Sequence, residues 1–197
     1  MEMTSRPWDV LERRHLYRNK WRSFVLDRVR LHTGSEIEYA YTELPDAVLV
    51  VPLTIDHRVV VVQQYRHPVG AWVWEVPAGS VGSDGPDAAA RRELAEEVGG
   101  RCTRLQQAAW FYSAAPDLRQ RIYVYLASGV TLGEQQLEDT ELLRVCLLSP
   151  EEAFARAHSG AITDGQSALA ILLCEPLIRC QLAQPGACVT GEGATPP

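Results

Sequence analysis

The first half of the chain distributes its apolar residues in patterns typical of β-strands. Residues 24–31 alternate apolar and polar side chains, and residues 36–42 match them across a turn at Thr33-Gly34-Ser35, which predicts a β-hairpin. Residues 47–53 and 58–64 are continuous runs rich in β-branched side chains, as in strands buried on both faces. Shorter apolar runs predict further strands at residues 72–76, 105–111, 121–126 and 142–148.

Helix signals concentrate in the second half of the chain. We expect one helix over residues 86–98, because Gly99 and the glycine after it supply a stop signal. Ser149 is a favourable N-cap, followed by proline and two acidic residues, so a second helix begins there. A third helix is expected over residues 165–182. This mixture predicts an α/β fold in which helices cover both faces of the sheet.

The composition is that of an ordinary globular protein. The 197 residues are 46% hydrophobic and 22% charged, which suits one domain with a sizeable core and a small extra layer. The 19 Lys and Arg residues against 25 Asp and Glu give a net charge of −6. That charge argues against a nucleic-acid binder, because such proteins need a basic face. No apolar run approaches the roughly 20 residues of a membrane span.

The cysteines predict a compartment rather than a framework of cross-links. The chain has 5 cysteines, and no two of them form a Cys-x-x-Cys pair. A disulfide framework and a zinc site are therefore not expected. We interpret the cysteines as small core residues of a reduced, cytoplasmic protein. Residues 1–14 are polar and charged, unlike a secretory signal.

The acids of the predicted helix over residues 86–98 are the candidates for chemistry. Glu93, Glu96 and Glu97 are spaced i, i+3 and i+4, so their carboxylates share one helix face. An acidic helix face is commonly no more than a solvated surface. These acids, however, lie near the helix C-terminus, where the macrodipole disfavours them, and a glycine-rich loop precedes the helix. Clustered carboxylates on a rigid element suit Mg²⁺, which takes oxygen ligands and bridges substrate phosphates.

The same helix resembles the signature of a known enzyme family. Residues 92–99, Arg-Glu-Leu-Ala-Glu-Glu-Val-Gly, match every defined position of R-E-U-x-E-E-x-G, the core of the Nudix box G-x5-E-x7-R-E-U-x-E-E-x-G-U, where U is bulky and apolar. The resemblance implies that Arg92 orients the carboxylates. Only four residues separate Gly79 from Asp84, Asp84 replaces the usual Glu, and Gly100 replaces an apolar residue. We expect these departures to alter the loop geometry more than metal binding.

Flanking segments resemble the ADP-ribose pyrophosphatase branch of this family. The similar segments are residues 64–70 with 74–79, residues 110–116 and residues 160–165, and the resemblance covers about residues 22–182. It implies a Nudix-type α/β/α sandwich with a mixed sheet and a small β-rich N-terminal element. The expected boundaries are residues 1–45 for that element, 46–183 for the hydrolase domain and 184–197 for a disordered tail.

The resemblance implies a metal site centred on the box. Glu93 and Glu97 would be the main ligands of Mg²⁺, or of Mn²⁺ in its place. Glu96 and the carbonyl of Ala78 would join them. A later loop in this branch carries a metal-linked acid, and Glu141 aligns with it.

A catalytic base is expected in the acidic loop at residues 137–141. Asp139 or Glu138 would take the proton from the attacking water, unless the loop is merely solvated. The implied catalytic set is Glu96, Glu97, Asp139 and Glu141. Relatives often carry a glutamate where Gln120 stands, and because glutamine cannot take a proton, the base must come from elsewhere.

The resemblance also implies substrate contacts. Arg66 would contact the phosphates or the terminal ribose, with an ordinary surface arginine as the alternative. Glu75 would bind ribose hydroxyls or support the metal, and a cross-strand ion pair is equally plausible. Trp21, or Trp8, would stack a nucleobase or anchor an interface. Pro116 occupies the position of the proline that the branch carries after the box.

The function implied is Mg²⁺-dependent hydrolysis of a nucleoside diphosphate derivative, with ADP-ribose as the leading substrate and AMP and ribose 5-phosphate as products. The alternatives are a pyrophosphatase for UDP- or GDP-sugars and a non-hydrolytic nucleotide-ligand sensor on the same fold. A homodimer is expected, because the N-terminal strands would otherwise leave a sheet edge open. Neither nucleic acid nor a membrane is an expected partner.

Overall fold

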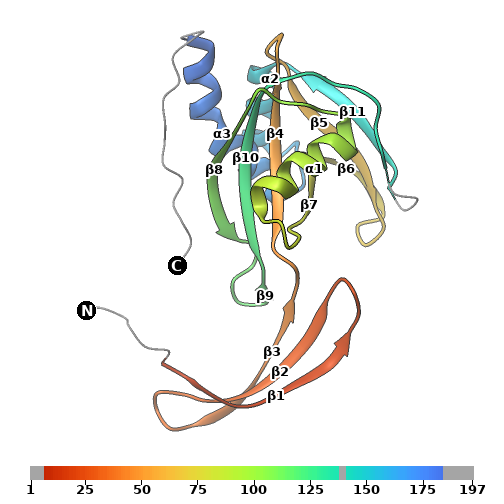
Figure 1. Cartoon of the computed structure of the whole chain (residues 1–197). Helices are drawn as coiled ribbons and strands as arrows, with labels where there is room; N and C mark the ends of the chain where they lie inside the picture. The colour runs from red at the N-terminus through yellow and green to blue at the C-terminus, as the bar shows by residue number, and fades with distance from the viewer. Residues whose placement is uncertain (1–6, 138–140, 184–197) are drawn as a thin grey trace. The chain divides into compact units, whose positions relative to one another are not determined.

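The structure, a computed structural model, describes residues 7–137 and 141–183 (Figure 1). The chain divides into two units. The first comprises Met1–Pro45 and Tyr112–Arg121, and the second comprises Asp46–Phe111 and Ile122–Pro197. The predicted disordered tail, residues 184–197, and the predicted base Asp139 lie outside the described residues.

The first unit is a four-stranded sheet in the order β1-β2-β3-β9. Its strands are β1 (Asp9–Arg18), β2 (Ser23–Arg30), β3 (Glu36–Glu43) and β9 (Leu118–Arg119). Strands β2 and β3 form the predicted antiparallel hairpin. Strand β1 was not predicted. Its register against β2 shifts twice, so its apolar residues do not alternate along the sequence: Val10, Leu11, Leu16 and Tyr17.

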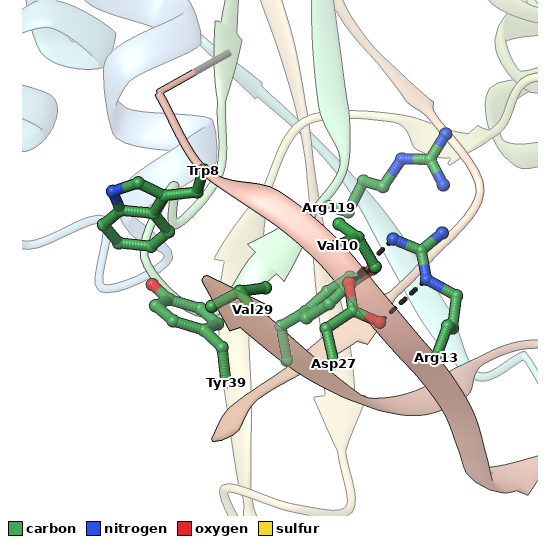
Figure 2. A pocket seen from close by; sticks show the side chains of 8 residues that line it. Trp8, Val10, Arg13, Asp27, Val29, Tyr39 and Arg119 are labelled. Carbon is green, nitrogen blue, oxygen red and sulfur yellow. Dashed lines mark hydrogen bonds and ion pairs between the residues drawn. The ribbon is translucent and has the colours of Figure 1, made fainter. Parts of the chain in front are cut away.

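One buried acid is built into this sheet. Asp27 on β2 is only 4% exposed, on the same face as Val25 and Val29. Arg13 on β1 donates to both carboxylate oxygens of Asp27, through Nε and Nη2 at 2.8 Å each, as Figure 2 shows. The Tyr41 hydroxyl donates to the same carboxylate at 3.3 Å. The hydrogen bond from Arg13 is the main reason why the pKa of Asp27 lies below its usual value.

The second unit holds a seven-stranded mixed sheet. Its main path runs β11-β5-β4-β10-β8, with β6 paired to β5 and β7 paired to β4. The central pair, β4 and β10, is parallel, whereas β5 pairs antiparallel with β4, β6 and β11. The strands are β4 (Ala47–Thr54), β5 (Val59–Arg66), β6 (Ala71–Glu75), β7 (Ala78–Ser80), β8 (Arg104–Tyr112), β10 (Arg121–Val130) and β11 (Leu143–Leu148).

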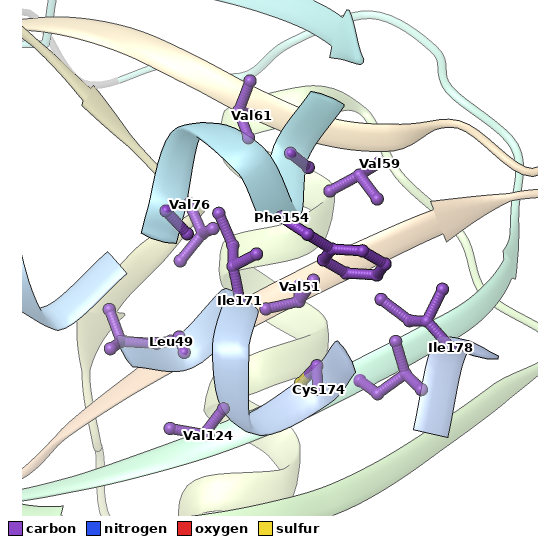
Figure 3. Packing of buried hydrophobic residues seen from close by; sticks show 14 of the residues in the cluster. Leu49, Val51, Val59, Val61, Val76, Val124, Phe154, Ile171, Cys174 and Ile178 are labelled. Carbon is purple, nitrogen blue, oxygen red and sulfur yellow. The ribbon is translucent and has the colours of Figure 1, made fainter. Parts of the chain in front are cut away.

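Helices cover both faces of this sheet, which confirms the predicted α/β/α sandwich. The helices are α1 (Pro86–Val98), α2 (Pro150–Ser159) and α3 (Gly165–Ala183). Val59 and Val61 of β5 pack with residues of α2 and α3 (Figure 3). Val60 and Val62 pack with Leu94 and its neighbours on α1. Burial on both faces explains why β4 and β5 are continuous apolar runs rather than alternating ones.

The helix ends follow the predicted capping signals. Ser149 caps α2, because its side-chain oxygen accepts the Glu152 backbone N–H at 3.1 Å. Helix α1 ends at Gly99, which adopts a left-handed conformation with φ of 61°. Within the described ranges, no helix has the length and apolar character that crossing a membrane would require.

Candidate functional site

The acidic stripe of α1 is not a solvated face. Glu93 is 8% exposed and Glu97 is 3% exposed, whereas the side chain of Glu96 is 41% exposed. The two buried acids lie one turn apart, and α1 packs against β4 and β7 in the second unit. The structure therefore places two carboxylates of the predicted metal site inside the protein, and the third near its surface.

Glu97 is the most perturbed of these acids. Burial, followed by the charges of Glu93 and Glu141, raises its pKa to about 8, while a backbone hydrogen bond from Ala78 opposes the rise. Among the residues that the structure describes, Glu97 Oε2 is the only buried side-chain nitrogen or oxygen that lacks a hydrogen-bond partner. Buried polar atoms are nearly always paired, so an unpaired carboxylate oxygen marks a place for a cation.

Glu93 is held in place from two sides. Arg92 Nη2 donates to Glu93 Oε1 at 2.8 Å and to the Ser80 carbonyl at 2.7 Å, and so ties α1 to β7. On the other side, a Cβ atom on Gly79 would overlap the Glu93 carboxylate. Only glycine permits this approach of backbone to carboxylate. Burial is the main reason why the pKa of Glu93 lies above its ordinary value.

Two departures from the box have local explanations. A Cβ atom on Gly100 would lie 2.8 Å from Leu94 Cγ, and the Gly100 N–H donates to the Leu94 carbonyl at 2.8 Å. Gly100 thus folds back onto the core residue of α1, which leaves no room for an apolar side chain there. Asp84 lies in the loop before α1, with Oδ2 at 4.0 Å from Arg92 Nη1, so this shortened loop still reaches the orienting arginine.

A pocket of about 430 Å³ adjoins these acids in the second unit. Arg66 on β5 and Glu75 on β6 line it and form a two-pronged ion pair with distances of 2.7 and 2.6 Å. For Glu75, the structure therefore shows the cross-strand ion pair. Hydrogen bonding to Glu75 raises the pKa of Arg66, and the charges of Glu97 and Asp164 add to the effect. Arg66 thus lines the pocket and is also within reach of the charge of Glu97.

Two further residues that line this pocket, Asp164 and Gln166, were not predicted as site residues. Ala78, whose carbonyl was an expected metal ligand, lines the pocket with them. Asp164 also caps α3, because its Oδ2 accepts the Ser167 N–H at 2.8 Å. An aspartate three residues before a helical serine is a recognisable N-cap signal, but its place beside Arg66 depends on tertiary structure.

Of the predicted acidic loop, only part can be placed. Glu141 lies close enough to raise the pKa of both Glu93 and Glu97 through its charge. Asp139 and Glu138 lie outside the described residues. Within residues 7–137 and 141–183, no three His, Cys, Asp or Glu side chains form a ready-made metal-binding group.

The remaining predicted residues belong to the first unit. Trp21 is 51% exposed, with the Lys20 ammonium 4.2 Å from its ring centre. The Pro116 carbonyl accepts the Tyr39 hydroxyl at 2.9 Å. Gln120 donates to the Pro45 carbonyl at 2.9 Å and accepts from Ser113 at 3.1 Å. A carboxylate could not donate the first of these bonds, which gives a structural reason for glutamine at position 120.

The first unit also has a pocket, which the sequence did not predict (Figure 2). It measures about 390 Å³ and contains the Arg13–Asp27 pair. The rings of Trp8 and Tyr39 lie 6.0 Å apart at its side. The one sequence signal was Asp27, an acid at an inward position of an alternating strand.

Three comparisons with known proteins identify the family and the fold. The family profile described as "NUDIX domain" matches residues 43–167. The chain is 26% identical over 165 residues to the ADP-ribose pyrophosphatase of Bacillus subtilis (strain 168), covering 82% of this chain and 89% of that protein. It is 29% identical over 150 residues to the methanol dehydrogenase activator of Bacillus methanolicus, covering 74% and 80%. A crystal structure of an ADP compounds hydrolase shares the fold, with a TM-score of 0.79 at 15% identity, covering 91% of this chain and 98% of that one.

Proposed function

Because the chain belongs to the Nudix hydrolase family, we propose that it hydrolyses the diphosphate bond of ADP-ribose to give AMP and ribose 5-phosphate. The substrate is suggested by the Bacillus subtilis relative, which is named an ADP-ribose pyrophosphatase. The observation that carries the proposal is the state of Glu97. Its carboxylate is buried, one oxygen has no hydrogen-bond partner among the described residues, and the charges of two other acids, Glu93 and Glu141, act on it. Burying such a cluster of carboxylates costs free energy unless a cation neutralises them. A cation that also binds a diphosphate fits this position.

The residues of the site fit a divalent metal ion, which the family generally uses. All of the expected donors are oxygen atoms, the type that Mg²⁺ prefers; they are the Ala78 carbonyl and the carboxylates of Glu93, Glu96, Glu97 and Glu141. We propose Mg²⁺ as the ion, with Mn²⁺ as a substitute. Such an ion, when bound, neutralises the diphosphate and lowers the pKa of a water molecule.

The acids of the protein have different proposed roles, in metal binding and in proton transfer. Burial keeps Glu93 and Glu97 in fixed positions, and Arg92 orients the Glu93 carboxylate. Asp139 or Glu138 is the proposed base that accepts the proton of the attacking water. Glu141, which follows that segment, is the proposed link to the metal, because its charge already acts on Glu97.

Arg66 is the proposed contact for a substrate phosphate or for the terminal ribose. Its pairing with Glu75 uses one hydrogen of Nε and one of Nη2. A guanidinium has five N–H donors, so three are left for a ligand. Glu75 is 6% exposed and therefore acts as a fixed support that holds the guanidinium in one orientation against the pocket wall.

The first unit is proposed to mediate homodimerisation and to supply a nucleobase contact at Trp21. Its strand β1 is an edge strand, and exposed apolar side chains gather on β1 and β2: Val10, Leu16, Tyr17 and Phe24. An open edge beside such a surface favours association with a second copy. A cytoplasmic location remains part of the proposal.

The proposal is tested by incubating the protein with ADP-ribose, UDP-glucose, GDP-mannose and a dinucleotide, in Mg²⁺ and in EDTA, with phosphate release measured after phosphatase treatment. We expect ADP-ribose to be hydrolysed fastest, and only with the metal. If a UDP- or GDP-sugar were hydrolysed faster than ADP-ribose, that nucleotide sugar would be the substrate instead. Binding without hydrolysis of any compound would overturn the enzymatic assignment in favour of a sensor.

The variant Glu97→Gln tests the site within that assay. We expect kcat to fall by at least about 100-fold, because an amide cannot provide the charge that holds the ion. The fold should survive, since the substitution keeps the shape and removes a buried charge. Glu151→Gln, on an exposed position of α2, is the matched control and should keep full activity. Turnover of Glu97→Gln near that of the wild type would remove Glu97 from the metal site.

A further inference from the structure

The segment that follows β10 packs against the C-terminal end of α1. Thr131 and Arg101 form an isolated antiparallel bridge, with backbone hydrogen bonds of 2.9 and 3.0 Å. Farther along, a Cβ atom on Gly99 would overlap the backbone of Gly133. Contact of backbone with backbone therefore holds this segment against the last turn of the helix.

Gln135 and Gln136 cap the helix at two functional positions. An α-helix leaves its last four carbonyls without helical partners. The Gln136 backbone N–H donates to the Glu96 carbonyl at 2.7 Å. The side-chain amide of Gln135 donates to the Glu97 carbonyl at 2.6 Å. The capped carbonyls thus belong to two residues whose carboxylates are expected at the metal.

This arrangement matters for Glu97 in two ways. The carbonyl and the side chain of a residue leave the same Cα atom, so fixing the carbonyl restricts the direction of the carboxylate. The helix C-terminus also carries partial negative charge beside an acidic cluster, and an N–H donor there offsets part of it. Without the Gln135 amide, the Glu97 carbonyl would lose this donor and the last turn would fray more readily, as helix ends do.

The same segment continues to the acidic loop. Six positions after Gln135 comes Glu141, whose charge raises the pKa of Glu97. Gln135 therefore contacts the last turn of α1, through the Glu97 carbonyl, in the stretch of chain that precedes Glu141. Metal sites depend on such supporting contacts, whose loss commonly lowers metal affinity or activity by about 10–100-fold.

We propose that Gln135 is a positioning residue for the metal site, which it aligns by holding the Glu97 carbonyl and with it the last turn of α1. The inference rests on the proposed function. Gln135 touches neither substrate nor metal in this proposal. Its amide instead sets the direction in which the Glu97 carboxylate faces the ion.

The test compares Gln135→Ala with Gln136→Ala. The second variant is a matched control, because Gln136 contributes only its backbone N–H and its side chain is exposed. Mn²⁺ binding is measured by calorimetry without substrate, and kcat and KM for ADP-ribose are measured at saturating and at sub-saturating metal. For Gln135→Ala we expect about 10-fold weaker Mn²⁺ affinity and a lower kcat at sub-saturating metal, with KM within about twofold. Gln136→Ala should match the wild type.

A second variant guards against misfolding. Gln135→Met keeps the length of the side chain and its neutral charge but has no N–H donor, so it should weaken Mn²⁺ binding about as much as alanine. If both Gln135 variants lower only the melting temperature and bind Mn²⁺ as the wild type does, the residue is a simple helix cap and the inference is overturned. If the wild type itself neither binds Mn²⁺ nor hydrolyses ADP-ribose, the proposed function fails instead.

Discussion

At the scale of single residues, burial sorts acids that look alike in the sequence. Glu93, Glu96 and Glu97 share one helix face, as their spacing predicts, yet only Glu96 is open to solvent. The sequence could predict the shared face because helical periodicity is local. It could not predict which acids β7 covers, because that contact is tertiary. The chemistry of Glu97 follows from that second, unpredicted fact.

The buried state of Glu97 predicts how pH affects the metal-free protein. Its pKa is about 8 in the folded state against 4.5 for the ordinary group, so between these values the folded state binds more protons than the unfolded state. Stability should therefore be highest at about pH 4.5 as far as Glu97 is concerned, and should fall as the pH rises to about 8. At about 1.4 kcal/mol per pKa unit, the loss is on the order of a few kcal/mol.

Urea unfolding in EDTA at about pH 5 and about pH 9 checks this expectation. The Glu97→Gln variant should lose less free energy of unfolding than the wild type between the two values, because its amide does not titrate. Added Mg²⁺ should restore the free energy of unfolding that the wild type loses at the higher pH. Equal losses in both proteins would show that Glu97 does not titrate in this range.

At the scale of elements, β7 and α1 together fix the position of the Glu93 carboxylate. Three-residue β7 brings the backbone of Gly79 against Glu93, and Arg92 on α1 reaches back to the Ser80 carbonyl. The ends of α1 were predictable from the proline at its start and Gly99 at its end. The approach of β7 was not, because a strand of three residues has too little pattern to detect. Strand β1 escaped prediction because its register shifts break the alternation.

Gly79→Ala tests this contact between β7 and α1. The added methyl group would overlap the Glu93 carboxylate, so we expect the carboxylate to move and kcat to fall by about 10–100-fold. Gly165→Ala is the matched control, because a Cβ atom there meets nothing within 4 Å and its backbone needs no left-handed conformation. Circular dichroism should be unchanged in both. Full activity of Gly79→Ala would mean that the Glu93 position is not critical.

At the scale of the whole molecule, the two units differ in what the sequence disclosed. The box and the runs of β4 and β5 predicted the second unit well, since both signals are local. In the first unit the hairpin was predicted, but the pairing of Arg13 with Asp27 was not. Nothing in the sequence marks which of the unit's arginines faces the inward acid, because β1 itself follows no clear period.

Asp27→Asn should destabilise the first unit at neutral pH. The pKa of Asp27 is lowered in the folded state, so its contribution is present above the ordinary carboxyl pKa and is lost as the pH falls through the lower, folded value. We expect a loss of about 1–3 kcal/mol at pH 7, since one partner of a buried, charge-assisted pair is weakened. Urea unfolding should show a difference from the wild type that shrinks as the pH falls below about 4.

An exposed pair provides the comparison. Glu36 lies 3.2 Å from Arg28 and 3.1 Å from Arg30, at 39% side-chain exposure. Glu36→Gln should change the stability by less than about 1 kcal/mol, because exposed ion pairs contribute little. If the two variants were equally stable at neutral pH, burial of Asp27 would have no energetic significance.

The parallel pairing of β4 with β10 also has a consequence for folding. Ala47 lies opposite Ile122 in this central pair, so the sheet closes only between segments that are far apart in the chain, with β5, β6, β7, α1, β8 and β9 between them. Contacts of this kind slow folding, since a long loop must close before they form. During synthesis the apolar residues of β4 are made long before their partners. We expect a chain truncated before β10 to aggregate, and the full chain to refold slowly.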